Sequence, residues 1–277
     1  MRWIGFAFYC LGWVLVSAAE YPVTVYVMDN GVRIDHEVFK ATNIKTVDLT
    51  GARKGERIID QEPYGDHATF LAGLILERAP AAELVSVRTL DQKGNGKWSE
   101  FIRGVHWITN HHPDGAPAVA NLSLGGLAKD PRVEKLVVRA IDQLVEDGVT
   151  VVVAGGNDGT DEEDRIPSTM DSVISVGAVS MFDARLDSSN YGSCVDVYAL
   201  GKGLEGPGSF SRVYRTQESG TSTAAAVVTG HIANFLSGKP EATPEEVKDW
   251  LLTNSPSGKV KNIPEGQGHK ALLFEGR

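Results

Sequence analysis

Short runs of apolar residues alternate with segments of helical periodicity along most of this chain. Six of these runs are rich in valine and mostly lack the polar alternation of a half-exposed strand. They therefore predict strands that are buried on both faces. The predicted strands are residues 23–28, 84–90, 118–122, 149–154, 173–179 and 195–200. Strands of this kind are typical of a parallel sheet that has helices on both sides.

Helical periodicity marks five further segments. It is clearest in residues 132–147, where apolar residues recur at i, i+3, i+4 and i+7. The last segment opens with Thr243-Pro244-Glu245-Glu246, a capping box with proline at the first helical position. The predicted helices are residues 67–78, 99–110, 132–147, 222–236 and 244–253. The alternation of strands and helices predicts right-handed βαβ units, and hence a three-layer α/β/α domain with a mainly parallel central sheet.

The N-terminus has the pattern of a secretory signal peptide. Arg2 is followed by fourteen uncharged residues, 3–16, and then by Ser17-Ala18-Ala19, which suits a cleavage site. A membrane anchor is the alternative, but fourteen residues are fewer than the roughly 20 that span a bilayer. We therefore predict a signal peptide at residues 1–19, a folded domain at residues 20–277, and a secreted, extracellular protein. Cleavage would remove Cys10 and leave Cys194 as the one cysteine, so we expect a fold without disulfides.

Composition narrows the classes of partner. The 277 residues include 42 % apolar residues, which suffices for a large core. The net charge of −9 argues against a nucleic-acid partner, which would require a basic face. No second segment is long and apolar enough to span a membrane, so we expect no membrane partner after signal removal, and a monomer.

Four segments place polar residues where predicted strands end or helices begin, which is where parallel sheets bind their ligands. Each has an ordinary alternative. Asp29 could belong to a simple Asp-Asn-Gly turn, and His67 could be a packed ring or a helix cap. The glycines before Asn157 could cradle a phosphate, although no Gly-Lys-Ser/Thr follows them. Ser222 could be a helix N-cap.

Taken together, the order Asp29, His67, Asn157, Ser222 indicates a catalytic site. The chain resembles the subtilisin-like serine peptidases, which carry the order Asp, His, Ser, and within them the proteinase K group. The resemblance spans residues 23–273. Its main motifs are 29–31 (DNG), similar to Asp-Thr/Ser-Gly, 66–73 (DHATFLAG), similar to Gly-His-Gly-Thr-His-Val-Ala-Gly, and 220–226 (GTSTAAA), similar to Gly-Thr-Ser-Met-Ala-Ala/Thr-Pro.

The resemblance implies a serine endopeptidase that forms an acyl-enzyme. Ser222 would be the nucleophile and His67 its base. Asp29 would orient the imidazole, and Asn157 would form an oxyanion hole with the backbone N–H of Ser222. The substrates would be polypeptides, protein inhibitors would be partners, and the chemistry would require no cofactor.

The resemblance also assigns a substrate cleft. An extended peptide would add as a strand between two backbone edges. The first edge is formed by Gly94, Asn95 and Gly96, and the second by Ser123, Leu124 and Gly125. Ala154, Gly155 and Gly156 would line the first specificity pocket, and Trp98 would wall a further apolar subsite. Broad specificity with a preference for apolar or aromatic side chains is expected.

A structural calcium site is implied as well. In the proteinase K group, two backbone carbonyls and one aspartate hold the ion, and oxygen ligands of this kind suit calcium. The matching residues are Asp171, Val173 and Asp196. We therefore predict that calcium stabilises the fold.

Several residues depart from the family pattern, and they keep a second hypothesis open. The departures lie next to the predicted histidine and serine, at Ala68, Phe70, Thr223 and Ala226. Residues 20–28 are expected to be too few for the inhibitory propeptide that the resemblance implies. The alternative is a catalytically weak or inactive protein of this fold that binds peptides or inhibitors. An α/β-hydrolase esterase is disfavoured, because Ser222 lacks the Gly-x-Ser-x-Gly context.

Overall fold

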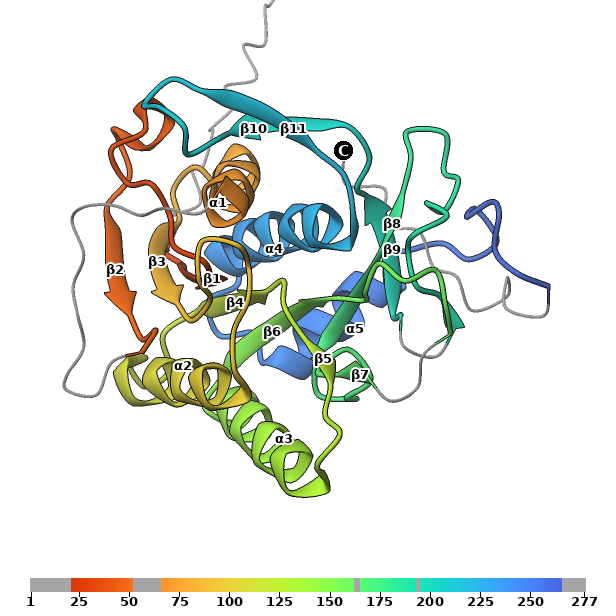
Figure 1. Ribbon diagram of the computed structural model, residues 1–277, viewed down its shortest axis with the longest axis horizontal. Coiled ribbons are helices and arrows are strands. Elements are labelled where there is room, and N and C mark those ends of the chain that lie inside the picture. Colours follow the sequence, from red (N-terminus) through yellow and green to blue (C-terminus); the bar gives the residue numbers. More distant parts are fainter. Residues whose placement is uncertain (1–20, 52–65, 162–164, 193–194, 266–277) are drawn as a thin grey trace, which may run out of the picture.

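A parallel β-sheet forms the centre of the computed structural model, which describes residues 21–51, 66–161, 165–192 and 195–265 (Figure 1). The predicted signal peptide and Cys194 lie outside these residues. The sheet has seven strands in the order β2-β3-β1-β4-β6-β8-β9, and each neighbouring pair is parallel. The strands are β1 (Thr24–Asp29), β2 (Ile44–Asp48), β3 (Glu83–Arg88), β4 (Ala118–Leu122), β6 (Val149–Ala154), β8 (Ile174–Val179) and β9 (Val197–Leu200).

Helices cover both faces of this sheet, which confirms the predicted three-layer α/β/α arrangement. In β1, Val25 and Val27 belong to one apolar cluster, whereas Tyr26 and Met28 belong to the other. The first cluster includes residues of α1 (Asp66–Arg78), α4 (Thr221–Gly238) and α5 (Pro244–Thr253), and the second includes residues of α2 (Trp98–His111) and α3 (Pro131–Glu146). Within the described ranges, none of the helices has both the length and the apolar character that crossing a membrane demands.

All six predicted strands and all five predicted helices are confirmed; residues 118–122, 149–154 and 244–253 match without change, and the others have shifted ends. The end of one strand has a clear cause. β9 begins at Val197 and not at residue 195. The cause is Asp196, whose N–H donates to the carbonyl of Ser175 and whose side-chain carboxylate, in place of a backbone carbonyl, accepts the N–H of Ser175. Elements that the periodicity did not predict are the 3₁₀ turn η1 (Glu37–Phe39), the edge strand β2, and the pairs β5 (Gly126–Leu127) with β7 (Arg165–Ile166) and β10 (Leu204–Pro207) with β11 (Arg215–Glu218).

The β10–β11 hairpin crosses over α1 and α4 at one side of the molecule (Figure 1). Small residues allow this close packing. A Cβ atom at Gly206 would lie 2.7 Å from the ring of Phe70, and one at Gly73 would lie 2.2 Å from Pro207. Phe70 is fully buried under the hairpin, so its departure from the family pattern supplies core packing. The hairpin thereby brings β11 beside the start of α1.

Candidate active site

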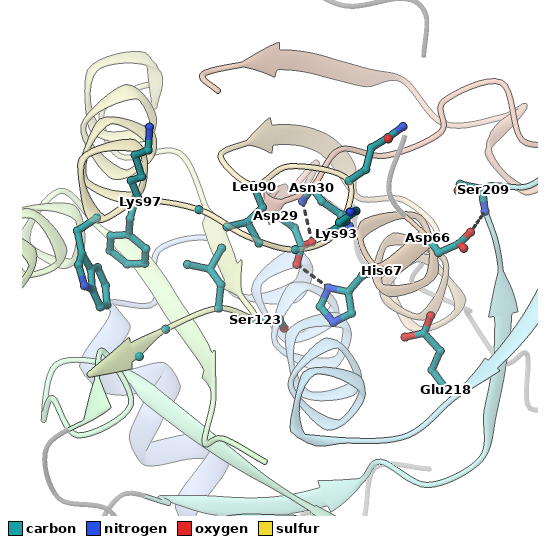
Figure 2. Close-up of a pocket in the computed structure, with 18 of the residues that line it drawn as sticks. Asp29, Asn30, Asp66, His67, Leu90, Lys93, Lys97, Ser123, Ser209 and Glu218 are labelled. Carbon is teal, nitrogen blue, oxygen red and sulfur yellow. Dashed lines mark hydrogen bonds and ion pairs between the residues drawn. The ribbon is translucent and has the colours of Figure 1, made fainter. Parts of the chain in front are cut away.

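Asp29 and His67 form a direct hydrogen bond where β1 ends and α1 begins (Figure 2). The Nδ1 of His67 lies 2.8 Å from Oδ2 of Asp29, and the other oxygen of Asp29 accepts the N–H of Asn30 at 2.7 Å. Asp29 is only 1 % exposed. Because a carboxylate can only accept, Nδ1 carries the proton, and Nε2 of a neutral ring is left with a free lone pair. The pair is therefore arranged as a base and the group that orients it.

Three contacts fix the start of α1, and with it the position of His67. The side-chain oxygen of Asn30 accepts the N–H of Ala68 at 3.0 Å, and the hydroxyl of Thr69 accepts the N–H of Arg33 at 3.0 Å. The carboxylate of Asp66 accepts the N–H of Ser209, as Figure 2 shows. The sequence indicated Asn30 only as part of a turn. Its role as a cap for α1 depends on a contact across 38 residues.

The electrostatic surroundings favour the protonated form of His67. Burial of the ring lowers its pKa, but the charge of Asp29, the hydrogen bond to Asp29 and the charge of Glu218 outweigh this and raise the pKa to about 9. Figure 2 shows Glu218 on the side of His67 away from Asp29, near Asp66. Burial raises the pKa of Glu218, the charge of His67 lowers it, and the charges of Asp66 and Asp29 raise it further. The pattern of apolar and polar positions in the sequence did not predict that Glu218 would lie near His67.

Asn157 is held against the start of α4 by its oxygen. Its Oδ1 accepts the N–H of Thr221 at 3.0 Å, so its NH₂ group remains available for another acceptor. The backbone at residue 220 has φ of +145°, which favours glycine, and a Cβ atom there would also press against that oxygen at 3.2 Å. Ser222 is the second residue of α4, directly after Thr221. Among residues 221–230 it is the one that is not buried.

The four predicted catalytic residues line two adjoining cavities. Asp29 and His67 line a cavity of about 950 Å³, whereas Asn157 and Ser222 line one of about 270 Å³. The two cavities share a wall formed by Ser123, Leu124 and Gly125. The structure thus brings the acid–histidine pair and the serine–asparagine pair to the two sides of the predicted second substrate edge.

Buried polar contacts hold this shared wall in place. The hydroxyl of Thr229, in α4, lies 3.1 Å from Oδ1 of Asn121, and the amide of Asn121 donates to the hydroxyl of Ser123 at 3.0 Å. That hydroxyl lies 3.5 Å from the carbonyl oxygen of Ser222. Asn121 has no exposed surface. The chain of contacts couples β4, the shared wall and the start of α4.

The residues predicted for the first substrate edge lie in different environments. Gly94, Gly96 and Trp98 line the larger cavity. Asn95 instead closes a tight turn, because its backbone N–H and its side-chain amide both donate to the carboxylate of Asp91. These contacts, with the N–H of Asn95 foremost, hold the pKa of Asp91 below its ordinary value.

Of the three residues predicted for the first specificity pocket, two line a cavity and one does not. Ala154 and Gly156 line the smaller cavity, together with Ile166 and Pro167. Gly155 lies behind this wall. Its N–H donates to the carbonyl of Val176 at 2.9 Å, and its own carbonyl accepts the side-chain amide of Asn190 at 3.0 Å. Gly155 thus joins the pocket to the sheet.

The three predicted calcium ligands do converge, but they converge on a lysine. The Nζ of Lys248, in α5, lies 3.0 Å from the carbonyl oxygen of Asp171, 2.7 Å from that of Val173 and 3.1 Å from the carboxylate of Asp196. Among the described residues, no group of three or more His, Cys, Asp or Glu side chains could hold a metal ion. The residues present therefore do not fit a calcium ion, because an ammonium group already lies among the same oxygens.

Comparison with known proteins gives consistent matches. The profile of the subtilase family matches residues 22–269. The chain is 36 % identical over 247 residues to the "Extracellular serine proteinase" of Thermus sp. (strain Rt41A), covering 89 % of this chain. It is 34 % identical over 257 residues to "Subtilisin-like protease 2" of Pseudogymnoascus destructans, covering 92 % of this chain.

A solved structure and the lengths of the relatives complete the comparison. The structure described as a cold adapted subtilisin-like serine proteinase superimposes with a TM-score of 0.79 at 27 % identity, covering 94 % of this chain and 91 % of that one. The chain spans 58 % of the length of the Thermus proteinase and 61 % of that of the Pseudogymnoascus protease. The chain therefore matches a little under two thirds of the length of these two relatives, whereas it matches nearly all of the solved structure.

Proposed function

The chain belongs to the subtilase family, and on that basis we propose that it is a secreted serine endopeptidase that cleaves polypeptides through an acyl-enzyme. The observation that carries the proposal is the hydrogen bond of 2.8 Å between His67 and the buried Asp29. It leaves Nε2 of a neutral ring free to accept a proton, and His67 lines the cavity that shares a wall with the cavity lined by Ser222. Relatives named as an extracellular serine proteinase and as subtilisin-like proteases support the reaction class and the secretion.

In the proposed mechanism, Nε2 of His67 takes the proton of the Ser222 hydroxyl as its oxygen attacks the scissile carbonyl. Asp29 holds the ring in the required tautomer and stabilises the imidazolium that forms. The free NH₂ group of Asn157 and the N–H of Ser222, at the start of α4, stabilise the oxyanion. His67 then protonates the leaving amine, and water releases the acyl group by the same steps in reverse.

The cavity walls support a peptide with apolar side chains as substrate. The larger cavity has several apolar walls, namely Leu90, Trp98, Phe101, Leu124 and Leu127. In the smaller cavity, Ala154, Ile166 and Pro167 are apolar, and the ion pair between Arg165 and Asp158, at 2.6 Å, also lines the space. We propose broad specificity with a preference for apolar or aromatic residues before the scissile bond. Gly94, Gly96 and Gly125, which belong to the two predicted edges, are exposed, and their backbone would suit an inhibitor loop that binds as a strand.

Two assays on the full chain test the proposed activity. A fluorophosphonate probe should label the folded protein, and casein should be hydrolysed into peptides. Secretion is tested separately: sequencing the N-terminus of secreted material should locate the cleavage predicted after Ala19. A folded protein that binds peptides but shows neither labelling nor hydrolysis would support the alternative of an inactive binding protein.

Asn157 is expected to contribute through its NH₂ group. Asn157→Ala should lower kcat by roughly 10²–10³-fold with little change in KM, because the lost donor acts on the oxyanion, which exists only after attack. That range comes from the corresponding asparagine of subtilisin. Steady-state kinetics on a peptide nitroanilide measure both constants.

Asn157→Asp is the matched control, because it keeps the shape and the oxygen that accepts the N–H of Thr221. It replaces the donor with a negative oxygen, so kcat should fall at least as far as in Asn157→Ala. If the Asp variant retains wild-type kcat, Asn157 does not stabilise the oxyanion.

The pH profile should report the raised pKa of His67. Only the neutral ring can accept the proton of Ser222, so kcat/KM should rise with pH and level off above the pKa of about 9. Glu218→Gln removes a charge that stabilises the imidazolium, so the inflection should move to lower pH. Rates measured from pH 6 to pH 10 give the inflection.

Glu205→Gln is the control for this charge effect, because Glu205 is exposed on the same hairpin and pairs with Gln217 in the neighbouring strand. It removes the same charge outside the cavity, so its inflection should stay close to that of the wild type. Equal shifts in the two variants would contradict a specific role for Glu218.

A further inference from the structure

The oxygens expected to bind calcium surround the ammonium group of Lys248. This group has three N–H donors, and three oxygens lie within hydrogen-bonding distance of Nζ: the carbonyls of Asp171 and Val173, at 3.0 and 2.7 Å, and a carboxylate oxygen of Asp196, at 3.1 Å. The side chain of Lys248 is 22 % exposed. Donors and acceptors are therefore matched in number around a largely enclosed cation.

The carboxylate of Asp196 links this cation to the sheet. One oxygen pairs with Lys248, and the other accepts the N–H of Ser175 at 2.8 Å. The backbone N–H of Asp196 also donates to the carbonyl of Ser175 at 3.0 Å. The start of β9 is thus bound to the start of β8, and both are bound to α5.

The position of Lys248 follows from the start and the buried face of α5. The capping box predicted from the sequence is present: the N–H of Glu246 donates to the hydroxyl of Thr243, and the N–H of Thr243 donates to the carboxylate of Glu246. Val247 and Leu251 are fully buried in the core. Lys248 precedes the buried Leu251 by three residues and is therefore its neighbour on the helix surface, at the border of the packed face, from which its ammonium group reaches the carbonyls of the loop before β8.

A calcium ion would require a different arrangement. Calcium takes six to eight oxygen ligands at about 2.3–2.6 Å, and the three oxygens here lie 2.7–3.1 Å from the centre of a positive charge. An ion at this place would have to displace Nζ, since two cations cannot share the same three oxygens without strong repulsion.

We infer that the ammonium group of Lys248 replaces a bound calcium ion as the cation that joins the loops before β8 and β9 to α5. The inference goes beyond the proposed function and does not depend on it, because it concerns how the fold is held together. A covalently tethered cation is not lost to dilution or to a chelator, whereas a bound ion stabilises the native state only as its free concentration allows.

Thermal unfolding of the full chain tests this inference. The wild type should unfold at the same Tm in excess calcium and in excess EGTA. Lys248→Met keeps the aliphatic stem and removes the charge, and should lower Tm by about 5 °C or more, because the carboxylate and two carbonyls lose their donor. Lys135→Met, at an exposed position of α3, is the matched control and should leave Tm within about 1 °C of the wild type.

Two results would overturn the inference. One is a Tm of Lys248→Met equal to that of the wild type. The other is a wild-type Tm that falls in EGTA, recovers with calcium and loses this response in Asp196→Asn. The second result requires no folded Lys248 variant, and neither readout requires activity, so failure of the proposed function would leave the test intact.

Discussion

Replacing Ser222 with alanine is expected to lower kcat by about 10⁶-fold, the size of the loss when the corresponding serine is removed from subtilisin. The reason is the loss of the one oxygen that can form the acyl bond. Ser222 keeps partial exposure at the start of α4 while its neighbours 223–230 are buried. The Ala variant should remain folded, since the change removes a single partly exposed hydroxyl. Hydrolysis of a peptide nitroanilide measures the rate, and labelling by a fluorophosphonate measures the nucleophile.

Two further variants make this expectation specific. His67→Ala should cost about as much as Ser222→Ala, and the double variant should lose little more than either one, because the two groups act as a unit. Ser237→Ala removes a serine hydroxyl near the other end of α4 and should keep both rate and label. If the folded wild type is not labelled, or if Ser222→Ala is labelled like the wild type, Ser222 is not the nucleophile.

The parts of this structure that the sequence predicted are those with a strong local pattern. The valine-rich run 149–154 matches β6, because a strand buried on both faces favours apolar residues on either side, here at all positions except Thr150. The capping box at Thr243 defined the start of α5 for the same local reason. The edge strand β2 escaped prediction, since Lys45 and Thr46 interrupt its apolar pattern and its first three residues are not buried.

The features of the site that escaped prediction all depend on contacts between distant segments. Glu218 influences His67 only because the β10–β11 hairpin lies over α1, and its sequence, with Gly206 and Pro207, has little strand character. Lys248 is an ordinary helical lysine until it meets the carbonyl of Asp171, 77 residues away. Motif resemblance located the oxygens predicted to bind calcium, but it could not show which cation they surround.

Replacing Asp29 with asparagine is expected to lower kcat by about 10⁴-fold, through the tautomer of His67. The structure determines how the amide must lie. The N–H of Asn30 donates to one oxygen of residue 29 at 2.7 Å, and a backbone N–H can only donate, so the amide oxygen of the variant has to take that position. The NH₂ group then faces Nδ1 of His67, which has to accept. The ring proton moves to Nε2, the atom that should take the proton of Ser222, and the base is lost.

The stability of the Asp29→Asn variant provides a second, independent readout. In the wild type, the pKa of His67 is raised from 6.5 to about 9, so the protonated ring contributes stability that is fully present below about pH 6.5 and is lost as the pH rises through 9. Without the charge of Asp29, burial of the ring should dominate and lower that pKa, so this loss of stability between pH 6.5 and 9 should disappear. Denaturant unfolding across this range measures it, and ¹⁵N NMR of the imidazole identifies the protonated nitrogen. A variant that keeps the proton on Nδ1, or that retains kcat within about tenfold of the wild type, would show that Asp29 does not act by selecting the tautomer.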